Sequence, residues 1–226
     1  MAENPLLPHR KLQELFTILS RARVLEKKQR TPFGREAVLA ATTIHLEAGD
    51  YLSSPLSDKP AELLGPARKS PASYADEATR LPLAAATARG LQLTGDRIAL
   101  AYTTAGEKAQ GWEDALTIAQ TERLPFVLCV VDATAGRGKA ASKALTWPAL
   151  ETLCRKLQMP ILTVDGDDAV AMYRAMQEAT LRGRTTLGPC VIWAVVTPAA
   201  TKLTPSQTPL GRLKRYLAAR NISRPQ

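Results

Sequence analysis

Residues 97–134 read RIALAYTTAGEKAQGWEDALTIAQTERLPFVLCVVDAT, and this stretch decides the fold. An apolar run at 97–102 predicts a strand, and a second apolar run at 124–131 predicts another. Between them, residues 103–106 indicate a turn, and the segment from about 107 to 118 has the apolar spacing of a helix. A strand, a helix and a strand in this order place two parallel strands in one sheet.

The rest of the chain repeats this alternation of helices and strands. Leu12, Leu15 and Leu19 fall at helical spacing and predict an amphipathic first helix. The predicted helices cover 10–29, 35–47, 82–93, 147–157 and about 168–183, and the further predicted strands cover 161–164 and 190–196. Because the strands are uninterrupted apolar runs, we expect an α/β fold with a mostly parallel sheet and helices on both faces.

Composition sets the expected organisation of the chain. With 226 residues, 45% of them hydrophobic, residues 1–226 have the size of a single well-buried domain. We expect an N-terminal helix in 1–30, a short irregular segment at 52–80 and a basic C-terminal segment at 198–226. No run of about 18 apolar residues and no signal-peptide core is evident, so we expect a cytoplasmic protein without a membrane span. The cysteines have no close-spaced pairing and are interpreted as buried thiols of a reducing compartment: Cys129, Cys154 and Cys190.

The stretch at 97–134 resembles the alpha subunits of thiamine-diphosphate-dependent 2-oxo acid dehydrogenases, of the type found in the first component of pyruvate dehydrogenase. In that family a strand ends on Gly-Asp-Gly, a helix follows, and the next strand ends on Asn-Asn. The corresponding residues here are Thr104-Ala105-Gly106 and Asp132-Ala133. The resemblance implies the thiamine-diphosphate-binding fold, with thiamine diphosphate and Mg²⁺ as the family's cofactors.

Five further segments resemble the same family in the same order along the chain. They are Phe33–Val38, Glu47–Tyr51, Leu81–Ala86, Val164–Asp168 and Pro209–Leu217. Between Tyr51 and Leu81 the chain is shorter than the family, which carries histidines facing the cofactor there. The histidines of this chain are His9 and His45, outside that interval. The chain therefore resembles a shortened family member.

Two alanines change what the resemblance implies about cofactors. Ala105 stands where the family has its metal-binding Asp, and Ala133 stands where it has its metal-binding Asn. Magnesium requires hard oxygen ligands, and alanine supplies no side-chain oxygen. Asp132 is one residue away, and adjacent residues at a strand end point in different directions. We therefore expect no cofactor, no metal ligand and no catalytic residue; the degenerate cofactor-binding positions are Thr104, Ala105, Gly106, Asp132 and Ala133. If this interpretation is wrong, the cofactors are thiamine diphosphate and Mg²⁺.

In an open parallel sheet, any remaining chemistry lies beyond the carboxyl ends of the strands. Here those ends are at 103–106, 132–138 and 165–168. We interpret Asp165 as a turn former and Asp168 as a helix cap. Glu36 is interpreted as a first-turn acid favoured by the helix dipole, with a buried polar contact as the alternative. The loop 134–143 is interpreted as a solvated loop, with anion binding as the alternative.

The charge of the chain suggests a further hypothesis. The formal net charge is +9, and residues 198–226 contain basic residues and no acidic ones. The basic residues are Lys202, Arg212, Lys214, Arg215, Arg220 and Arg224. Such a segment can meet nucleic acid, an anionic surface or an acidic protein. Nucleic acid is disfavoured, because stacking aromatic residues are sparse there and no reading motif is present.

Two main functions compete at this stage. The first is a non-catalytic relative of the alpha subunit, retained for association with a beta-like subunit or with another copy of itself. The second is a functional thiamine-diphosphate-dependent alpha subunit with an altered metal site, which needs a beta subunit. A basic nucleic-acid-binding protein is a minor third possibility. For the first function, we expect the association surface on helices 81–93 and 110–120, including Trp112.

Overall fold

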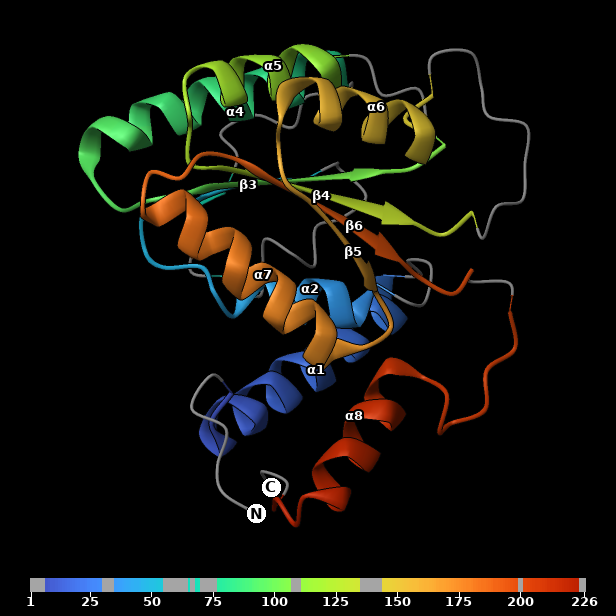
Figure 1. Ribbon diagram of the computed structural model, residues 1–226. Coiled ribbons are helices and arrows are strands. Elements are labelled where there is room, and N and C mark those ends of the chain that lie inside the picture. Colours follow the sequence, from blue (N-terminus) through green and yellow to red (C-terminus); the bar gives the residue numbers. More distant parts are fainter. Residues whose placement is uncertain are drawn as a thin grey trace.

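The computed structural model describes residues 7–29, 35–54, 65, 68–69, 77–106, 111–134, 144–198 and 201–223. Within them, six strands form one sheet in the order β2-β1-β3-β4-β6-β5 (Figure 1). The strands are β1 Tyr51–Ser53, β2 Arg68–Lys69, β3 Ala99–Thr104, β4 Phe126–Asp132, β5 Ile161–Asp165 and β6 Cys190–Val195. All neighbouring pairs are parallel, which confirms the predicted fold class.

Helices cover both faces of the sheet, as the continuous apolar strands predicted (Figure 1). On one face lie α4 Glu77–Thr94, α5 Trp112–Thr121 and α6 Trp147–Leu157, and on the other lie α1 His9–Gln29, α2 Glu36–Thr43 and α7 Ala169–Arg184. The last described helix, α8 Pro209–Ala219, packs beside α1. The side chain of Gln13 donates to the carbonyl of Ser223 at 2.9 Å and ties the chain after α8 to α1.

The alternation of side chains along the strands builds one hydrophobic core on each face. In β3, Leu100 and Tyr102 point toward α1, α2 and α7, into the core that we call the core below the sheet. Ala99 and Ala101 point toward α4 and α5, into the core above the sheet. Small side chains on α4, such as Ala88, let this helix lie close to the sheet. The three cysteines are free and buried, as predicted.

Several predicted boundaries are wrong. The turn expected at 103–106 begins two residues later, because Thr103 and Thr104 continue the ladder of β3. The second helix ends at Thr43, so His45 follows the helix and is not part of it. The hydroxyls of the two threonines at its end bond back to carbonyls one turn earlier, as Thr42 Oγ1 does to Val38 at 2.7 Å.

Two segments have more regular structure than expected. The segment 52–80 was predicted to be irregular, but it contains most of β1, all of β2 and the start of α4. Strands of two or three residues are too short to show a periodic pattern. The basic segment 198–226 contains α8, whose Leu213 and Leu217 are buried against the core below the sheet. This helix is therefore amphipathic: its leucines face the core, and its basic residues Arg212, Lys214 and Arg215 are not buried.

Two features named for the predicted association surface are buried, so for these residues the prediction is wrong. Trp112 is 4% exposed and lies in the core above the sheet. The alanine-rich side of α4 packs into the same core, with Ala84, Ala85 and Ala88 fully buried. The sequence pattern correctly marked apolar helix faces, but these faces cover the protein's own sheet.

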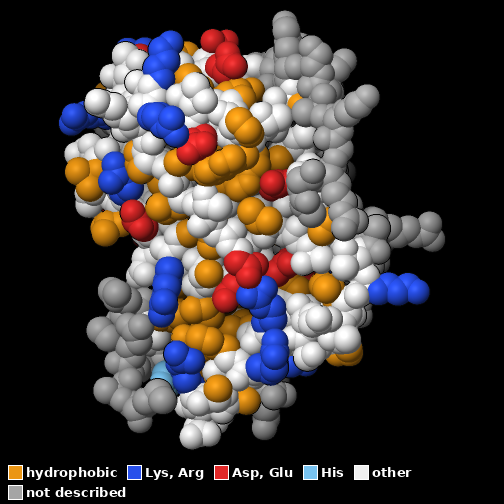
Figure 2. Space-filling view, turned by 45° about the vertical axis from the view of Figure 1, so that its right-hand side comes forward, with side chains coloured by type: hydrophobic (Ala, Val, Ile, Leu, Met, Phe, Trp, Pro, Cys, Tyr) orange, Lys and Arg blue, Asp and Glu red, His pale blue; other side chains and the backbone are white. Residues whose placement is uncertain are grey.

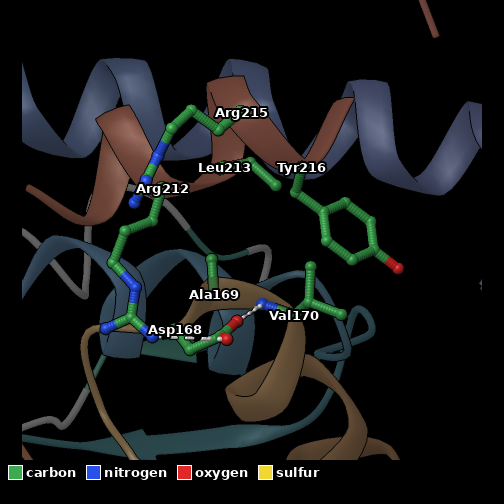
Figure 3. Close-up of a pocket in the computed structure, with 7 residues that line it drawn as sticks. All are labelled: Asp168, Ala169, Val170, Arg212, Leu213, Arg215 and Tyr216. Atoms are coloured by element: carbon green, nitrogen blue, oxygen red, sulfur yellow. Dashed lines mark hydrogen bonds and ion pairs between the residues drawn. The ribbon is translucent and has the colours of Figure 1, made fainter. Parts of the chain in front are cut away.

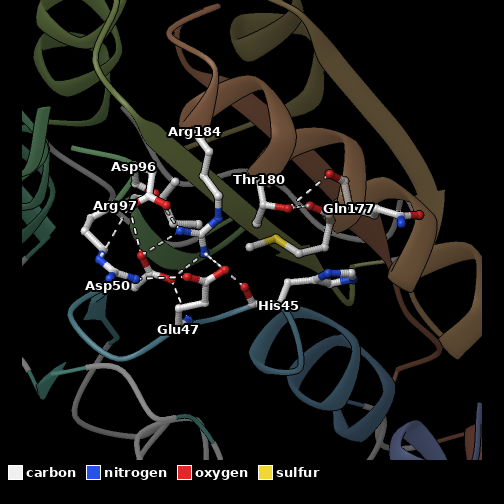
Figure 4. Close-up of polar contacts among 10 residues, drawn as sticks. His45, Glu47, Asp50, Asp96, Arg97, Gln177, Thr180 and Arg184 are labelled. Atoms are coloured by element: carbon white, nitrogen blue, oxygen red, sulfur yellow. Dashed lines mark hydrogen bonds and ion pairs between the residues drawn. The ribbon is translucent and has the colours of Figure 1, made fainter. Parts of the chain in front are cut away.

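A buried ion pair ties the amino-terminal side of the sheet together (Figure 4). Asp50 is fully buried, and Arg184 Nη2 lies 2.7 Å from its Oδ2. The same carboxylate accepts the backbone N–H groups of Glu47 and Ile98 at 2.7 and 3.0 Å. Arg184 also donates to the carbonyls of His45 and Asp96. The end of α7 is thereby joined to the chain before β1 and before β3.

His45 lies next to this ion pair and is held in its neutral form. Its Nε2 donates to the carbonyl of Tyr173 at 3.0 Å, and its ring lies 4.3 Å from the Tyr173 ring. Burial lowers the pKa of His45 from 6.5 to about 4, against the smaller raising effect of that hydrogen bond. The nearby charges of Lys11 and Arg184 also lower this pKa.

The low pKa of His45 predicts a loss of stability on mild acidification. The folded-state pKa is about 4 and the unfolded value about 6.5, so the unfolded chain takes up the proton first as the pH falls. The contribution of neutral His45 to the free energy of unfolding is fully present above pH 6.5. It is lost as the pH falls toward 4, and the total loss is roughly 3 kcal/mol. Urea unfolding at a series of pH values checks this. His45→Gln keeps an N–H donor but cannot titrate, so its stability should change less with pH; identical pH profiles would contradict the prediction.

Candidate functional site

The carboxyl ends of β3 and β4 lie side by side, as the resemblance implied. Thr104 pairs with Val131 in the parallel ladder. Ala105 and Gly106 therefore follow one strand directly beside Asp132 and Ala133 at the end of the next. The structure thus brings all five sequence-predicted positions to one edge of the sheet.

The turn after β3 uses its backbone donors inside the protein. The N–H of Ala105 donates to the carbonyl of Val131 at 3.0 Å, and the N–H of Gly106 donates to the carbonyl of Leu145 at 2.9 Å. Gly106 has a φ of +83°, which favours glycine. Ala105 is 7% exposed and packs into the core above the sheet. These two amides therefore do not face an incoming anion.

The carboxylate at the end of β4 is also in use. Asp132 Oδ1 accepts the N–H of Thr134 at 2.8 Å and its hydroxyl at 2.6 Å. The carbonyl of Asp132 accepts the N–H of Val196 at 2.8 Å. Ala133 is partly buried against the core below the sheet. Asp132 therefore stabilises its own turn.

These residues do not fit a magnesium–diphosphate complex. Such a complex needs several oxygen ligands converging in a near-octahedral shell. At the ends of β3 and β4, the described residues offer one carboxylate, already bonded to Thr134, and two alanines at the family's ligand positions. Across the described ranges, no group of three or more His, Cys, Asp or Glu side chains is arranged to hold a metal ion. Residues 135–143, which form most of the loop considered for anion binding, lie outside the described residues.

Two arginines at this edge were missed by the sequence interpretation. Arg80 of α4 is 2% exposed and donates to Ser53 Oγ at 2.9 Å and to the carbonyl of Tyr102. It joins the ends of β1 and β3. Arg35 lies before α2, and its Nη2 is 3.5 Å from Thr104 Oγ1. A lone arginine in a helical pattern gives no signal of burial, so only the fold shows these contacts.

The acidic residues after β5 have structural roles, as predicted for two of them. Asp168 Oδ1 caps α7 by accepting the N–H groups of Val170 and Ala171 at 2.9 and 3.1 Å. Asp165 Oδ1 accepts the N–H of Asp167 at 3.0 Å and forms the turn. Arg212 of α8 binds the other oxygens of both carboxylates, at 2.7 Å for Asp165 and 3.4 Å for Asp168.

Asp167 lies between these residues and is almost fully buried. Its Oδ2 accepts the N–H and the hydroxyl of Thr197, which joins the ends of β5 and β6. Its Oδ1 is buried without a hydrogen-bond partner in the described structure. Burial raises the pKa of Asp167, against the lowering effect of the Thr197 hydrogen bonds.

A small pocket of about 150 Å³ lies where α8 meets the start of α7 (Figure 3). It is lined by Asp168, Ala169, Val170, Arg212, Leu213, Arg215 and Tyr216. The Asp168 carboxylate in its wall is already bonded to the α7 amides and to Arg212. The pocket is therefore a seam between two helices whose polar wall is largely satisfied internally.

Glu36 makes the buried contact that was considered as the alternative. It is fully buried in the first turn of α2, and Arg23 Nη1 lies 3.2 Å from its Oε1. This ion pair joins α1 to α2 at the face below the sheet. The first turn of a helix also favours a carboxylate through the helix dipole. Glu36 therefore fits both the first-turn interpretation and the buried-contact alternative.

The central part of the chain establishes the family to which the protein belongs. The family model described as the dehydrogenase E1 component matches residues 76–196, from α4 through β6. The chain belongs to this family. The resemblance noted in the sequence is therefore confirmed for the E1 component family, and the matched segment contains both strand ends that carry the two alanines.

Solved structures support the fold of this E1 component relative. Transketolase from Campylobacter jejuni subsp. jejuni is similar with a TM-score of 0.57 and 14% identity, over 94% of this chain and 43% of that chain. A protein from Mycobacterium smegmatis, whose proposed class is thiamin diphosphate-dependent enzyme, has a TM-score of 0.57 and 18% identity, over 74% and 32%. The chain thus spans less than half the length of either structure. No curated protein sequence matches it.

Proposed function

We propose that this E1 component relative binds no thiamine diphosphate with magnesium and acts through association with another subunit. The observation that carries the proposal is the pair of alanines at the ends of β3 and β4. Ala105 and Ala133 stand where the resembling family places its metal ligands, and neither supplies a side-chain oxygen. Without these ligands, the negative diphosphate and the divalent ion lose their main anchor.

The hydrogen bonds around the alanines support the same proposal. The N–H groups of Ala105 and Gly106 donate hydrogen bonds to carbonyls of the protein itself. Asp132 is the nearest carboxylate, and its bonded oxygen serves Thr134. A metal site here would require this turn to be broken and the carboxylate redirected. For that reason we favour the non-catalytic function over a working subunit with an altered metal site.

The basic C-terminal segment does not favour nucleic acid as a partner. Arg212 is bound to Asp165 and Asp168, and the guanidinium of Arg220 lies 3.9 Å from the centre of the Tyr216 ring. Both side chains therefore take part in the protein's own structure. We propose that the partner is a second copy of the chain or a beta-like subunit.

Apolar side chains on the described surface are compatible with such a partner. Those with the largest exposed fractions are Leu93 at 86%, Leu181 at 60%, Leu187 at 59% and Val24 at 51%. Among the described helices, none has the length and hydrophobicity needed to span a bilayer.

Light scattering on the purified chain, alone and mixed with a 2-oxo acid dehydrogenase beta subunit from its native host, tests the association. We expect a mass above that of the monomer in at least one of these samples. A clean monomer at tens of micromolar in both would contradict the proposal. The same samples should show no oxidation of a 2-oxo acid when thiamine diphosphate, Mg²⁺ and a dye acceptor are added; turnover above the beta subunit alone would contradict the non-catalytic function.

A further inference from the structure

Among the described residues, no strand pairs with the outer side of β5. This strand is the outermost strand after β6, and its exposure increases at Thr163 and Asp165. Pro160 accepts the N–H of Val191, and Gly166 donates to Val195, which sets the phase of the parallel ladder to β6. In that phase, even-numbered residues of β5 bond to β6. The N–H and C=O groups of Ile161 and Thr163 and the N–H of Asp165 therefore point away from the sheet, while the carbonyl of Asp165 accepts the N–H of Asp168 at 3.1 Å.

Half-buried apolar side chains flank this open edge on both faces. Ile161 packs against the same core above the sheet as Leu153 and Leu157 of α6, while Leu162 and Val164 lie below it. All five remain only partly covered by this chain. Figure 2 shows hydrophobic side chains gathered across the middle of the molecule on the face turned toward the viewer, above a cluster of acidic side chains.

The two ends of this edge carry opposite charges. The last turn of α6, close in sequence to the start of β5, carries Lys156 and Arg155, and Arg155 is paired with Glu151 at 3.1 Å. Asp165 and Asp168 lie at the other end, with side chains 52% and 41% exposed, and because they share the single cation of Arg212 they leave one negative charge there. An antiparallel copy of the same edge would place each basic end near the acidic end of the other chain. The edge is thus complementary to itself, as the contact surface of a two-fold dimer must be.

We propose that the chain pairs with a second copy of itself through β5, antiparallel and centred on Thr163, so that two sheets join into one. In this register Thr163 meets Thr163 of the second copy as a hydrogen-bonded pair, and Ile161 meets Asp165. Leu162 then lies opposite Val164, and both lose their remaining exposed surface. A dimer needs roughly 1,200 Å² of buried surface, so α6 must also contact its counterpart across the axis.

This inference rests on the association proposed above and names its partner and its surface. Cross-linking tests the register directly. The two Cα atoms of a hydrogen-bonded antiparallel pair lie about 5.5 Å apart, within the range for a disulfide. Thr163→Cys should therefore give a cross-linked dimer under mild oxidation, because the natural cysteines are buried. Thr117→Cys, on the exposed side of α5, is the matched control and should stay largely uncross-linked.

Light scattering on a second pair of variants gives an independent readout. Thr163→Lys places like charges opposite each other on the axis and should shift the chain to monomer, whereas Thr117→Lys should not. Thr163 is exposed and its backbone N–H points outward, so both substitutions at this position should leave the melting temperature within a few degrees. A dimer unaffected by Thr163→Lys, with no cross-link at Thr163→Cys, would overturn the edge pairing and leave association standing. A monomeric natural chain without a cross-link would overturn the pairing as well.

Discussion

Arg184→Met is expected to lower the free energy of unfolding by about 3–5 kcal/mol, because it leaves the buried Asp50 carboxylate without its cation. Asp50 is fully buried, and the side chain of Arg184 is only 15% exposed. The methionine fills a similar volume, so the loss is chiefly electrostatic. The substitution also removes the donors to the carbonyls of His45 and Asp96.

Urea unfolding of both proteins at pH 7 measures this effect, and a drop in melting temperature of roughly 10 °C should accompany it. Arg97→Met is the matched control. Arg97 lies 2.9 Å from Glu47 in the same network, but both side chains are substantially exposed, so its loss should cost about 1 kcal/mol or less. Asp50→Asn combined with Arg184→Met should cost less than the sum of the two single changes. Equal effects of the two arginine substitutions would contradict the assignment.

Trp112→Arg is expected to destabilise the fold by about 4 kcal/mol or more. Trp112 is 4% exposed at the start of α5 and packs in the core above the sheet. Replacing it opens a cavity and also buries a charge among apolar side chains. Far-UV circular dichroism and thermal melting should show a chain that is largely unfolded near 37 °C.

Ile118→Arg provides the control on the same helix. Ile118 is 41% exposed, so its replacement should change the free energy of unfolding by about 0.5 kcal/mol. If Trp112→Arg left the melting temperature unchanged and only dissociated an oligomer, Trp112 would belong to an interface and not to the core.

The fold could be predicted where each element carries its own pattern. The apolar runs of β4 and β6 were long enough to mark buried strands, and the bounds of α6 at Trp147 and Leu157 match the prediction. The short strands β1 and β2 could not be found in this way, because two or three residues show no period. Nor could the Asp50–Arg184 pair, whose members are 134 residues apart and meet only after the sheet has formed.

The candidate site could be located from the sequence but not described. The resemblance placed Ala105 and Ala133 at neighbouring strand ends, and the ladder between β3 and β4 confirms that position. The structure adds that the Gly106 amide bonds to Leu145 and that Arg80 is buried beside β3. Both contacts depend on residues that are distant in sequence. The outward direction of the odd-numbered N–H and C=O groups of β5 could likewise be found only from the strand order, since a strand's sequence does not say which of its sides is unpaired.

The proposal that the site has lost its cofactor is tested most directly by thermal melting of the purified chain with and without millimolar thiamine diphosphate and Mg²⁺. A ligand that binds only the folded state, present at a hundredfold excess over its dissociation constant, stabilises it by about 2.7 kcal/mol. For a chain of this size, that corresponds to a rise of roughly 5–10 °C. We predict a cooperative transition whose midpoint is the same in both samples. A clear rise with the cofactor pair, absent with Mg²⁺ alone and abolished by Asp132→Ala, would contradict the loss of the site.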